Sequence, residues 1–451
     1  MPPIIDSIIL LLIIVLVARF IKRQTGFLQR LFIPSSLIAG VLGLLMGPQI
    51  LGYFTPEVTS YWEQFPKYLI NIVFAGLFLG RFIPSMKEIW KTSAPMIAFG
   101  NTLAWGQYVI GIALSLFVLS PLFGTNPMVG SLIEISFEGG HGTAAGLAPT
   151  FEELGWAEGT DIALGLATFS LVAAIISGVI LVNIYNRRRG NLNNDELWKE
   201  QERQLIKSGY DILDLAKKFN ERPKTLLINI IAFALSIGIG WVLLQGLILT
   251  EDIVMSQFTD LRFFTYLPLF TLAMLGGLIV QLGLKRLDKQ SLIKRRTAEN
   301  FSSIALDLLI ASAIATVSLK VIGENWAVFA ILAFAGVAWI LGSFYFFAPR
   351  FFPTNWFVNG ITNVGQSMGM TATGLLLNRL IDPKNEVKAK ESFAYKQLAF
   401  EPFMGGGIVT AMAAIVIHEF GSGIAFIIAY LITAFWIGLG LWLGKNHKQS
   451  S

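Results

Sequence analysis

The sequence predicts an all-α polytopic membrane protein: two inverted repeats of five transmembrane helices, each with a re-entrant loop, plus an additional C-terminal helix. Of the 451 residues, 54% are hydrophobic and 14% are charged. The apolar residues come in blocks close to the roughly twenty that a helix needs to cross a bilayer. The sequence also repeats itself once, as many transporters do, and contains no long soluble block for a separate catalytic domain.

The predicted spans form two halves. Those of the first half cover Ile4–Ile21, Ile33–Gly47, Tyr68–Ile83, Thr92–Ser120 and Asp161–Tyr185. Those of the second half cover Thr225–Ile248, Tyr266–Gly283, Ser303–Ile322, Trp326–Phe347 and Pro402–Ile417, with the additional helix at Ile424–Gly444. We therefore expect a first repeat in residues 1–186 with a re-entrant loop at 127–150, a linker at 187–224, a second repeat in 225–420 with a loop at 353–380, and a C-terminal segment 421–451 with a basic tail.

The linker carries an amphipathic pattern. Between Asp195 and Phe219, apolar residues recur every seven positions on an otherwise charged stretch, at Trp198, Leu205, Ile212 and Phe219. This pattern predicts a helix on the cytoplasmic membrane surface that joins the two halves. A binding site for a calmodulin-like partner is the alternative.

Positive charge indicates the orientation. With the N-terminus outside and the spans alternating, all of the 34 Lys and Arg residues except Lys67, Arg262 and Lys320 fall on the cytoplasmic side. The positive-inside rule predicts this asymmetry for a plasma (inner) membrane protein with a cytoplasmic C-terminus. Topology therefore explains the net charge of +5, and no nucleic acid is expected as a partner.

Two pairs of segments carry the repeat. Pro34–Gly43 aligns with Pro268–Gly277, sharing the proline, one alanine and the final glycine. Near the end of each half, Thr143–Leu147 aligns with Thr371–Leu375. The same register places Glu138 opposite Gln366. Because the first half begins outside and the second begins inside, the repeats are inverted, and the two loops enter the membrane from opposite sides.

Both loops have polar, glycine-bearing sequences. Phe137–Thr143 combines glycines with a glutamate, a histidine and a threonine. In hydrocarbon each unsatisfied backbone group costs several kcal/mol, so such a segment is expected to line a cavity or be buried in protein. Where two such loops meet near the midplane, half-helix N-termini attract anions, and carbonyls and hydroxyls coordinate a small cation.

The two loops, at FEGGHGTAAG (137–146) and GMTATGLL (369–376), resemble the two loop motifs of the sodium/glutamate symporter family, with close wording only in the first loop and a similar layout over almost the whole chain. The resemblance implies inverted five-helix repeats and sodium-coupled uptake of glutamate or a related amino acid, by alternating access between the loops. Na⁺ is the implied coupling ion, and we expect a homodimer in the lipid bilayer. The candidate substrate- or ion-binding residues in the two loops are Glu138, Gly139, Gly140, His141, Gly142, Thr143, Asn363, Gln366, Gly369, Thr371 and Thr373, with Thr143, Thr371, Asn363 and Gln366 as candidate Na⁺ ligands.

Glu138 departs from the family pattern, which has a small hydroxyl residue before the double glycine. A fixed carboxylate beside an anion site repels glutamate, so a different carboxylate or a zwitterionic solute is the alternative substrate. Three interpretations stay open: Glu138 is protonated, binds a cation, or faces a cationic or zwitterionic solute.

Other polar residues have both a functional and a structural interpretation. Asp307 is a charge about one turn into the eighth predicted helix, so it is a site candidate unless it reaches the interface. His141 either carries a proton or bonds a carboxylate, or it orders the loop. Asn101 and Gln107 in the fourth helix are expected to hydrogen-bond between helices rather than to act as ligands.

Two further function classes fit less well. A channel presents rings of polar residues from identical subunits more often than two unlike loops in one chain. His418-Glu419 resembles the start of a zinc-protease helix, but no second histidine follows four residues later, and the sequence contains 3 His and no Cys. We therefore expect a transporter, with an ion channel as the remoter alternative, and no enzyme.

Overall fold

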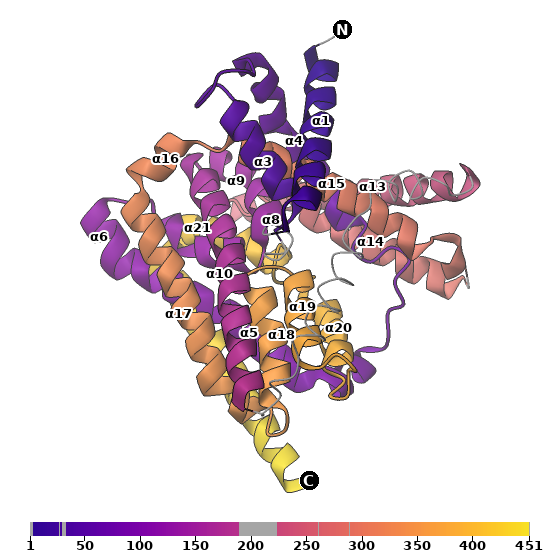
Figure 1. Ribbon diagram of the computed structural model, residues 1–451, viewed down its shortest axis with the longest axis vertical. Helices are drawn as coiled ribbons and strands as arrows, with labels where there is room; N and C mark the ends of the chain where they lie inside the picture. Colours follow the sequence, from indigo (N-terminus) through magenta and orange to yellow (C-terminus); the bar gives the residue numbers. More distant parts are fainter. Residues whose placement is uncertain are drawn as a thin grey trace. The chain divides into compact units, whose positions relative to one another are not determined.

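The computed structural model describes residues 3–26, 28, 33–188, 223–259, 261–287 and 289–450. The regular secondary structure within these ranges is helical (Figure 1). The chain divides into two compact units that alternate along the sequence. Unit 1 comprises Met1–Ile83, His141–Leu164 and Glu202–Lys320, and unit 2 comprises Pro84–Gly140, Gly165–Gln201 and Val321–Ser451. Each unit therefore takes segments from both halves of the sequence.

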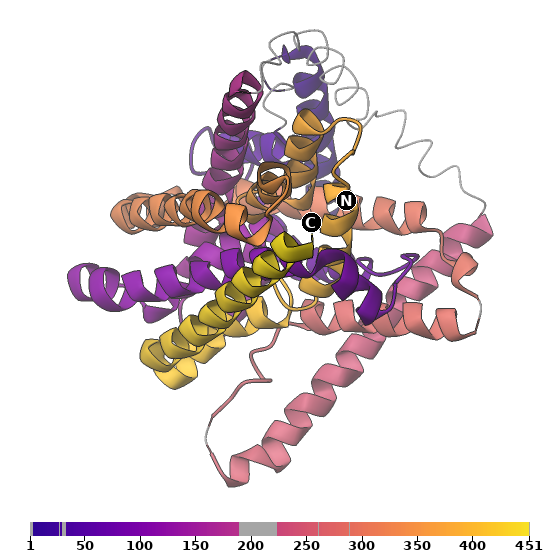
Figure 2. The ribbon, with the colours of Figure 1, turned by 90° about the horizontal axis from the view of Figure 1, so that it is seen from below.

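Unit 1 is built on a few close helix pairs. Its elements are α1 (Pro3–Gln24), α3 (Ser35–Met46), α4 (Pro56–Ala75), α9 (Ala148–Glu153), α13 (Pro223–Ile253), η3 (Met255–Gln257), α14 (Leu269–Arg286), η4 (Gln290–Leu292) and α15 (Arg295–Thr316). Helix α15 packs against α3 and α4, and α13 packs along α14, the pink and salmon pair in Figure 2. Small residues permit this approach, because a methyl added to Gly43 of α3 meets Ala315 of α15 at 2.7 Å.

Unit 2 is organised around α5 (Met86–Leu114). Its other elements are η1 (Ser115–Leu119), α6 (Ser120–Phe123), η2 (Pro127–Ser131), α7 (Leu132–Phe137), α17 (Trp326–Phe351), α18 (Trp356–Ser367), α19 (Thr371–Ile381), α20 (Ala389–Phe400) and α21 (Ile408–Ser450). Helix α5 contacts α7, α17, α18, α20 and α21. The short helices α18, α19 and α20 also pack against one another (Figure 1). Three helices, α8 (Gly140–Gly146), α10 (Glu158–Arg188) and α16 (Leu319–Glu324), continue from one unit into the other.

The helices confirm a polytopic membrane protein. Among the described residues, 8 helices are long and apolar enough to cross a bilayer, and two shorter apolar ones are Ser35–Met46 and Pro127–Phe137. Their outward side chains are apolar too: on α13, Leu227, Leu235 and Trp241 are exposed. A helix with apolar side chains on its outward face is suited to lipid contact.

The boundaries of one predicted span in the first half were wrong. The span predicted at Tyr68–Ile83 belongs to α4, which begins at Pro56 and ends at Ala75. The chain then turns with Gly80 at φ 68°, and Arg295 donates to the carbonyl oxygens of Gly76, Leu77 and Leu79 at 2.9–3.2 Å. This cation replaces the intrahelical donors that the carbonyls lose where the helix stops.

The two predicted C-terminal spans run together as α21, where Gly421 alone leaves the helical conformation, at φ 79°. The sequence prediction also missed α20, which lies between the second loop and α21. The amphipathic linker helix predicted at Asp195–Phe219 lies outside the described residues.

Aligned prolines precede two helices of unit 1. Pro34 comes directly before α3 with φ −57° and ψ 141°, and Pro268 comes directly before α14 with φ −72° and ψ 142°. Proline fixes φ near this value and cannot donate a backbone hydrogen bond, so it suits the residue at which a helix starts. The aligned segments of the predicted repeat thus begin a helix in the same way.

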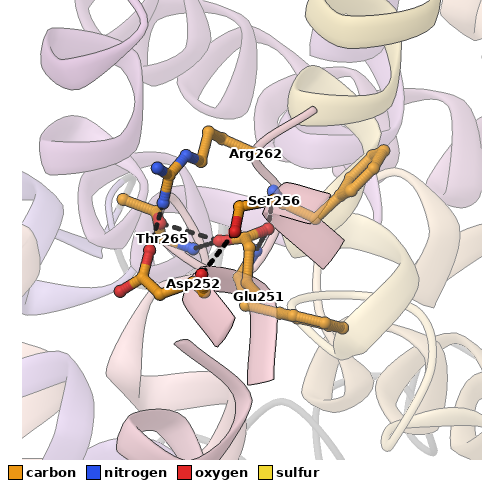
Figure 3. A network of polar contacts seen from close by, with 7 residues as sticks. Glu251, Asp252, Ser256, Arg262 and Thr265 are labelled. Atoms are coloured by element: carbon orange, nitrogen blue, oxygen red, sulfur yellow. Dashed lines mark hydrogen bonds and ion pairs between the residues drawn. The ribbon is translucent and has the colours of Figure 1, made fainter. Parts of the chain in front are cut away.

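A carboxylate holds the turn between α13 and α14 (Figure 3). The Oε1 atom of Glu251 accepts hydrogen bonds from the backbone N–H groups of Phe263 and Phe264, and Oε2 accepts from the N–H and hydroxyl of Thr265 at 2.9 and 2.7 Å. Beside it, Asp252 pairs with Arg262 in a half-exposed ion pair. Glu251 therefore accepts hydrogen bonds from backbone N–H groups that lie outside the helices and have no helical carbonyl partner.

Candidate substrate and ion site

The first glycine-rich segment is divided between the two units. Glu138–Gly140 belongs to unit 2, and His141–Thr143 belongs to unit 1. The candidate residues of the second segment all belong to unit 2, and they are Asn363, Gln366, Gly369, Thr371 and Thr373. Unit 2 therefore brings Glu138, and not His141 or Thr143, together with the second segment in one compact body.

A buried polar chain joins α7, α18 and α20 in unit 2. Gln366 Nε2 donates to Glu138 Oε2, and Lys396 Nζ donates to Gln366 Oε1 at 2.9 Å. Lys396 is 0% exposed and Glu138 is 6% exposed. Burying either charge alone is costly, so the two opposite charges on either side of one amide stabilise each other. The residues that the repeat register placed opposite each other, Glu138 and Gln366, are in direct contact.

Two glycines contribute to the polar chain of Glu138, Gln366 and Lys396, one through its backbone conformation and one through the space it leaves. Gly140 starts α8 with φ 67°, a conformation that side-chain-bearing residues rarely adopt. At Gly100 of α5, an added methyl collides with Cε and Nζ of Lys396. Both positions therefore require glycine for a physical reason, one for backbone conformation and the other for space.

One helical turn before Glu138, the carboxylate of Glu134 is fully buried and fully bonded. It accepts from the Tyr108 hydroxyl at 2.5 Å, the Thr410 hydroxyl at 2.8 Å and the Gly405 N–H at 3.1 Å. Three donors satisfy an acceptor-only group, so Glu134 ties α7 to α5 and to the start of α21.

One buried amide oxygen of this region is unsatisfied in the described part of the chain. Asn363 Oδ1 has no hydrogen-bond partner there, whereas the Ser367 hydroxyl donates to the carboxylate of Glu138. The amide nitrogen of Asn363 donates to the carbonyl of Asn359 at 3.2 Å and contacts Met96 Sδ at 2.6 Å. Gln107 donates from α5 to the carbonyl of Ser367, the interhelical role that its sequence position indicated. Buried acceptors without donors are typical of a site that binds a ligand.

The rest of the second segment is bonded within unit 2. Thr371 is the first residue of α19, and its hydroxyl accepts from Gln397 Nε2 at 3.0 Å. Gly369 donates its N–H to the carbonyl of Gln366 at 3.2 Å, and Thr373 is buried. Of the candidate Na⁺ ligands in this segment, Gln366 Oε1 and Thr371 Oγ1 already accept a hydrogen bond.

In unit 1, His141 and Thr143 are buried, and Thr143 Oγ1 has no hydrogen-bond partner among the described residues. Gly142 lies close to α15, since an added methyl meets Leu306 Cδ1 at 3.3 Å. Asp307 on α15 forms an ion pair with Arg19 of α1 at 2.9 Å, with side-chain exposures of 22% and 9%. Asp307 is therefore paired within the helix bundle of unit 1.

Sequence reasoning missed Lys396, Gln397 and Tyr108. The charge count treated Lys396 as one of the cytoplasmic surface charges, but its side chain is completely buried. A signal was present: Phe393, Lys396, Gln397 and Phe400 follow the spacing of one helix face, and all are buried on α20. Two polar side chains between two phenylalanines on one face indicate a buried polar site.

Comparison with known families identifies the relatives of this chain. The family model of the sodium/glutamate symporter matches residues 3–353. The chain belongs to the sodium/glutamate symporter family. No curated protein matches it. Within this symporter, Tyr108, Glu134 and Glu138 lie inside the matched stretch, whereas α18 to α21, with Gln366 and Lys396, lie beyond it.

Family membership settles the class of function. A sodium/glutamate symporter is a transporter and not an enzyme, and the match, which includes the first loop, confirms the family that the sequence resembles. Its family name implies coupling of solute uptake to Na⁺ and a membrane setting.

Proposed function

We propose that this symporter carries glutamate or a closely related acidic amino acid together with Na⁺, and that the solute binds beside the Glu138–Gln366–Lys396 chain of unit 2. The observation that carries the proposal is the buried Lys396. A carboxylate next to an anion site repels glutamate, but the ammonium one amide away compensates Glu138. The site as a whole is then close to neutral, so the extra carboxylate does not exclude an acidic solute.

Uptake into proteoliposomes tests this proposal. We expect saturable uptake of radioactive glutamate that requires an inward Na⁺ gradient and stops when choline replaces Na⁺. Competition by zwitterionic amino acids or by dicarboxylates, with none by glutamate, overturns glutamate as the substrate. Solute flux that neither saturates nor depends on Na⁺ favours the channel alternative.

The Glu138→Gln variant examines the residue by which this chain departs from its family. If Glu138 binds the coupling cation, the variant needs more Na⁺ for half-maximal uptake and keeps its solute preference. If Glu138 sets specificity by repelling anions, acidic solutes compete better in the variant. An unchanged Na⁺ curve together with an unchanged competitor profile leaves Glu138 a structural residue.

We also propose that the coupling Na⁺ uses a buried oxygen of unit 1 that has no donor among the described residues, Thr143 Oγ1. A hydroxyl oxygen is a suitable ligand for a hard cation. Thr143→Ala should raise the Na⁺ concentration for half-maximal uptake. Thr371→Ala is the comparison, because its hydroxyl already accepts from Gln397. A larger effect at Thr371 than at Thr143 contradicts this assignment.

Alternating access between two re-entrant loops of inverted repeats completes the proposal. The proline-initiated helices α3 and α14 and the contact between Glu138 and Gln366 support the repeat register. Because the chain has no Cys, single cysteines report topology without background. Those at Pro2, Glu152 and Asp252 should label from outside, and those at Ser208, Lys289 and Ser450 from inside. Labelling of Pro2 and Ser208 from the same side refutes the inversion, and the mass of the purified protein tests the expected homodimer.

A further inference from the structure

The surroundings of Lys396 are those of a bound cation rather than of a surface lysine. Its Nζ donates to two amide oxygens, Gln366 Oε1 at 2.9 Å and Gln397 Oε1 at 2.8 Å, and lies 3.6 Å from the centroid of the Phe400 ring. These are neutral, electron-rich groups that attract a positive charge. The side chain is 0% exposed, so water does not solvate the ammonium.

More oxygens lie around the same point. A methyl built on Gly100 comes within 2.9 Å of Lys396 Nζ and 3.4 Å of Asn363 Oδ1. The Asn363 oxygen has no hydrogen-bond partner in the described part of the chain, and the carboxylate of Glu138 accepts from Gln366 and from the Ser367 hydroxyl. Amide and carboxylate oxygens are the ligands that hard cations such as Na⁺ prefer.

The carboxylates near Lys396 favour one positive charge at the position of its ammonium. Glu138 attracts Lys396 through the shared Gln366, and Glu401, directly after α20, attracts it as well. Glu134 also lies in unit 2, but its carboxylate is taken up by Tyr108, Thr410 and Gly405. Removal of the ammonium therefore leaves buried oxygens and an uncompensated carboxylate.

We propose that Lys396 is a tethered cation that fills a sodium-type oxygen site in unit 2. While its ammonium contacts Gln366 and Gln397, a Na⁺ ion cannot bind to those two oxygens, so the Na⁺ used in coupling binds elsewhere. Only the statement that the coupling Na⁺ binds elsewhere rests on the proposed function. The prediction that the site accepts Na⁺ once the ammonium is removed does not depend on transport.

The test is equilibrium binding of radioactive sodium to the purified full-length protein, without solute. Lys396→Met keeps the aliphatic stem of the side chain and removes the charge. We expect it to bind about one more Na⁺ per chain than the wild type, because the charge balance of the site changes by one unit. Lys390→Met, on the same helix, is the matched control and should bind as the wild type does. The double variant Glu138→Gln Lys396→Met should lose the added ion, since it removes both charges.

Lys396→Cys gives a second measurement on one protein sample. Its additional Na⁺ should be lost on reaction with aminoethyl methanethiosulfonate, which restores an ammonium there, and kept on reaction with methyl methanethiosulfonate. Folded Lys396→Met and Lys396→Cys proteins that bind no more Na⁺ than the wild type overturn the proposal. If the wild type shows no Na⁺-driven uptake while Lys396→Met gains an ion, the proposed coupling fails and the tethered cation stands. If the wild type shows Na⁺-driven uptake while Lys396→Met gains no ion, the tethered cation is refuted and the proposed coupling stands.

Discussion

Each unit buries a pair of opposite charges, and the two pairs are built differently. In unit 1, Arg19 donates directly to Asp307 at 2.9 Å, between α1 and α15. In unit 2, Lys396 and Glu138 are joined only through the amide of Gln366. The direct pair forms its own contact, whereas the two charges of the bridged pair do not touch and depend on the neutral amide between them.

The difference indicates separate roles for the two pairs. In a direct pair the two charges are in contact, and their attraction comes mostly from this short distance. Such a pair serves to hold two helices together. In a bridged pair the charges and the buried acceptors remain available to a ligand in the folded protein. We therefore expect changes in unit 1 to act on stability and changes in unit 2 to act on transport.

The largest expected effect is at the direct pair. Asp307→Ala should lower the unfolding free energy by about 3 kcal/mol, because it leaves the Arg19 charge buried without its carboxylate. The double variant Arg19→Met Asp307→Leu should restore most of this loss and keep transport. Thermal unfolding in detergent measures the first effect and proteoliposome uptake the second. A double variant that folds but does not transport breaks the comparison, since Asp307 then belongs to the site.

The carboxylate of Glu251 should have the next largest effect. Glu251→Gln keeps one acceptor oxygen but removes the charge that holds Phe263, Phe264 and Thr265, at a cost of about 2 kcal/mol. Asp252→Asn is the control, because its half-exposed ion pair with Arg262 is worth less than about 1 kcal/mol. Thermal unfolding of both variants measures the difference. Equal effects contradict the view that burial and backbone donors, rather than charge, decide the strength of these contacts.

Gly100→Ala sharpens the comparison from the side of unit 2. The added methyl displaces the ammonium of Lys396, so uptake should fall about tenfold, which corresponds to about 1.4 kcal/mol. Gly246→Ala is the control, since no atom lies within 4 Å of the added methyl at this position of α13. Full uptake by Gly100→Ala, with the folded protein confirmed by gel filtration, shows that the position of Lys396 does not matter for transport.

The smallest effect concerns pH and unit 1. Burial, followed by repulsion from Glu152, raises the pKa of Glu63. Folded protein then binds more protons than unfolded protein between the ordinary and the raised pKa, so stability should fall as pH rises through that window. Glu63→Gln should flatten this slope in thermal unfolding scans from pH 4 to 7. A slope that persists in the variant assigns the effect to another group.

The sequence by itself determined the class of protein and most of its long helices. Apolar blocks near the length of a bilayer span predicted the long helices, because the cost of exposing backbone groups to lipid leaves few other structures. The glycine-rich wording of the two loops resembled the family that the match over residues 3–353 then showed. The alignment of Glu138 with Gln366 likewise needed only the order of residues.

Tertiary structure alone decided which charges are buried and with whom. Lys396 follows a second loop rich in polar residues and counts as one of many cytoplasmic lysines in the sequence, yet α20 packs it against α5 and α18. Asp307, a site candidate from the sequence, lies beside Arg19, which is 288 positions away along the chain. Neither partner follows from spacing along the chain, because these contacts depend on how separate helices pack, and a charge's environment is set by its neighbours in space.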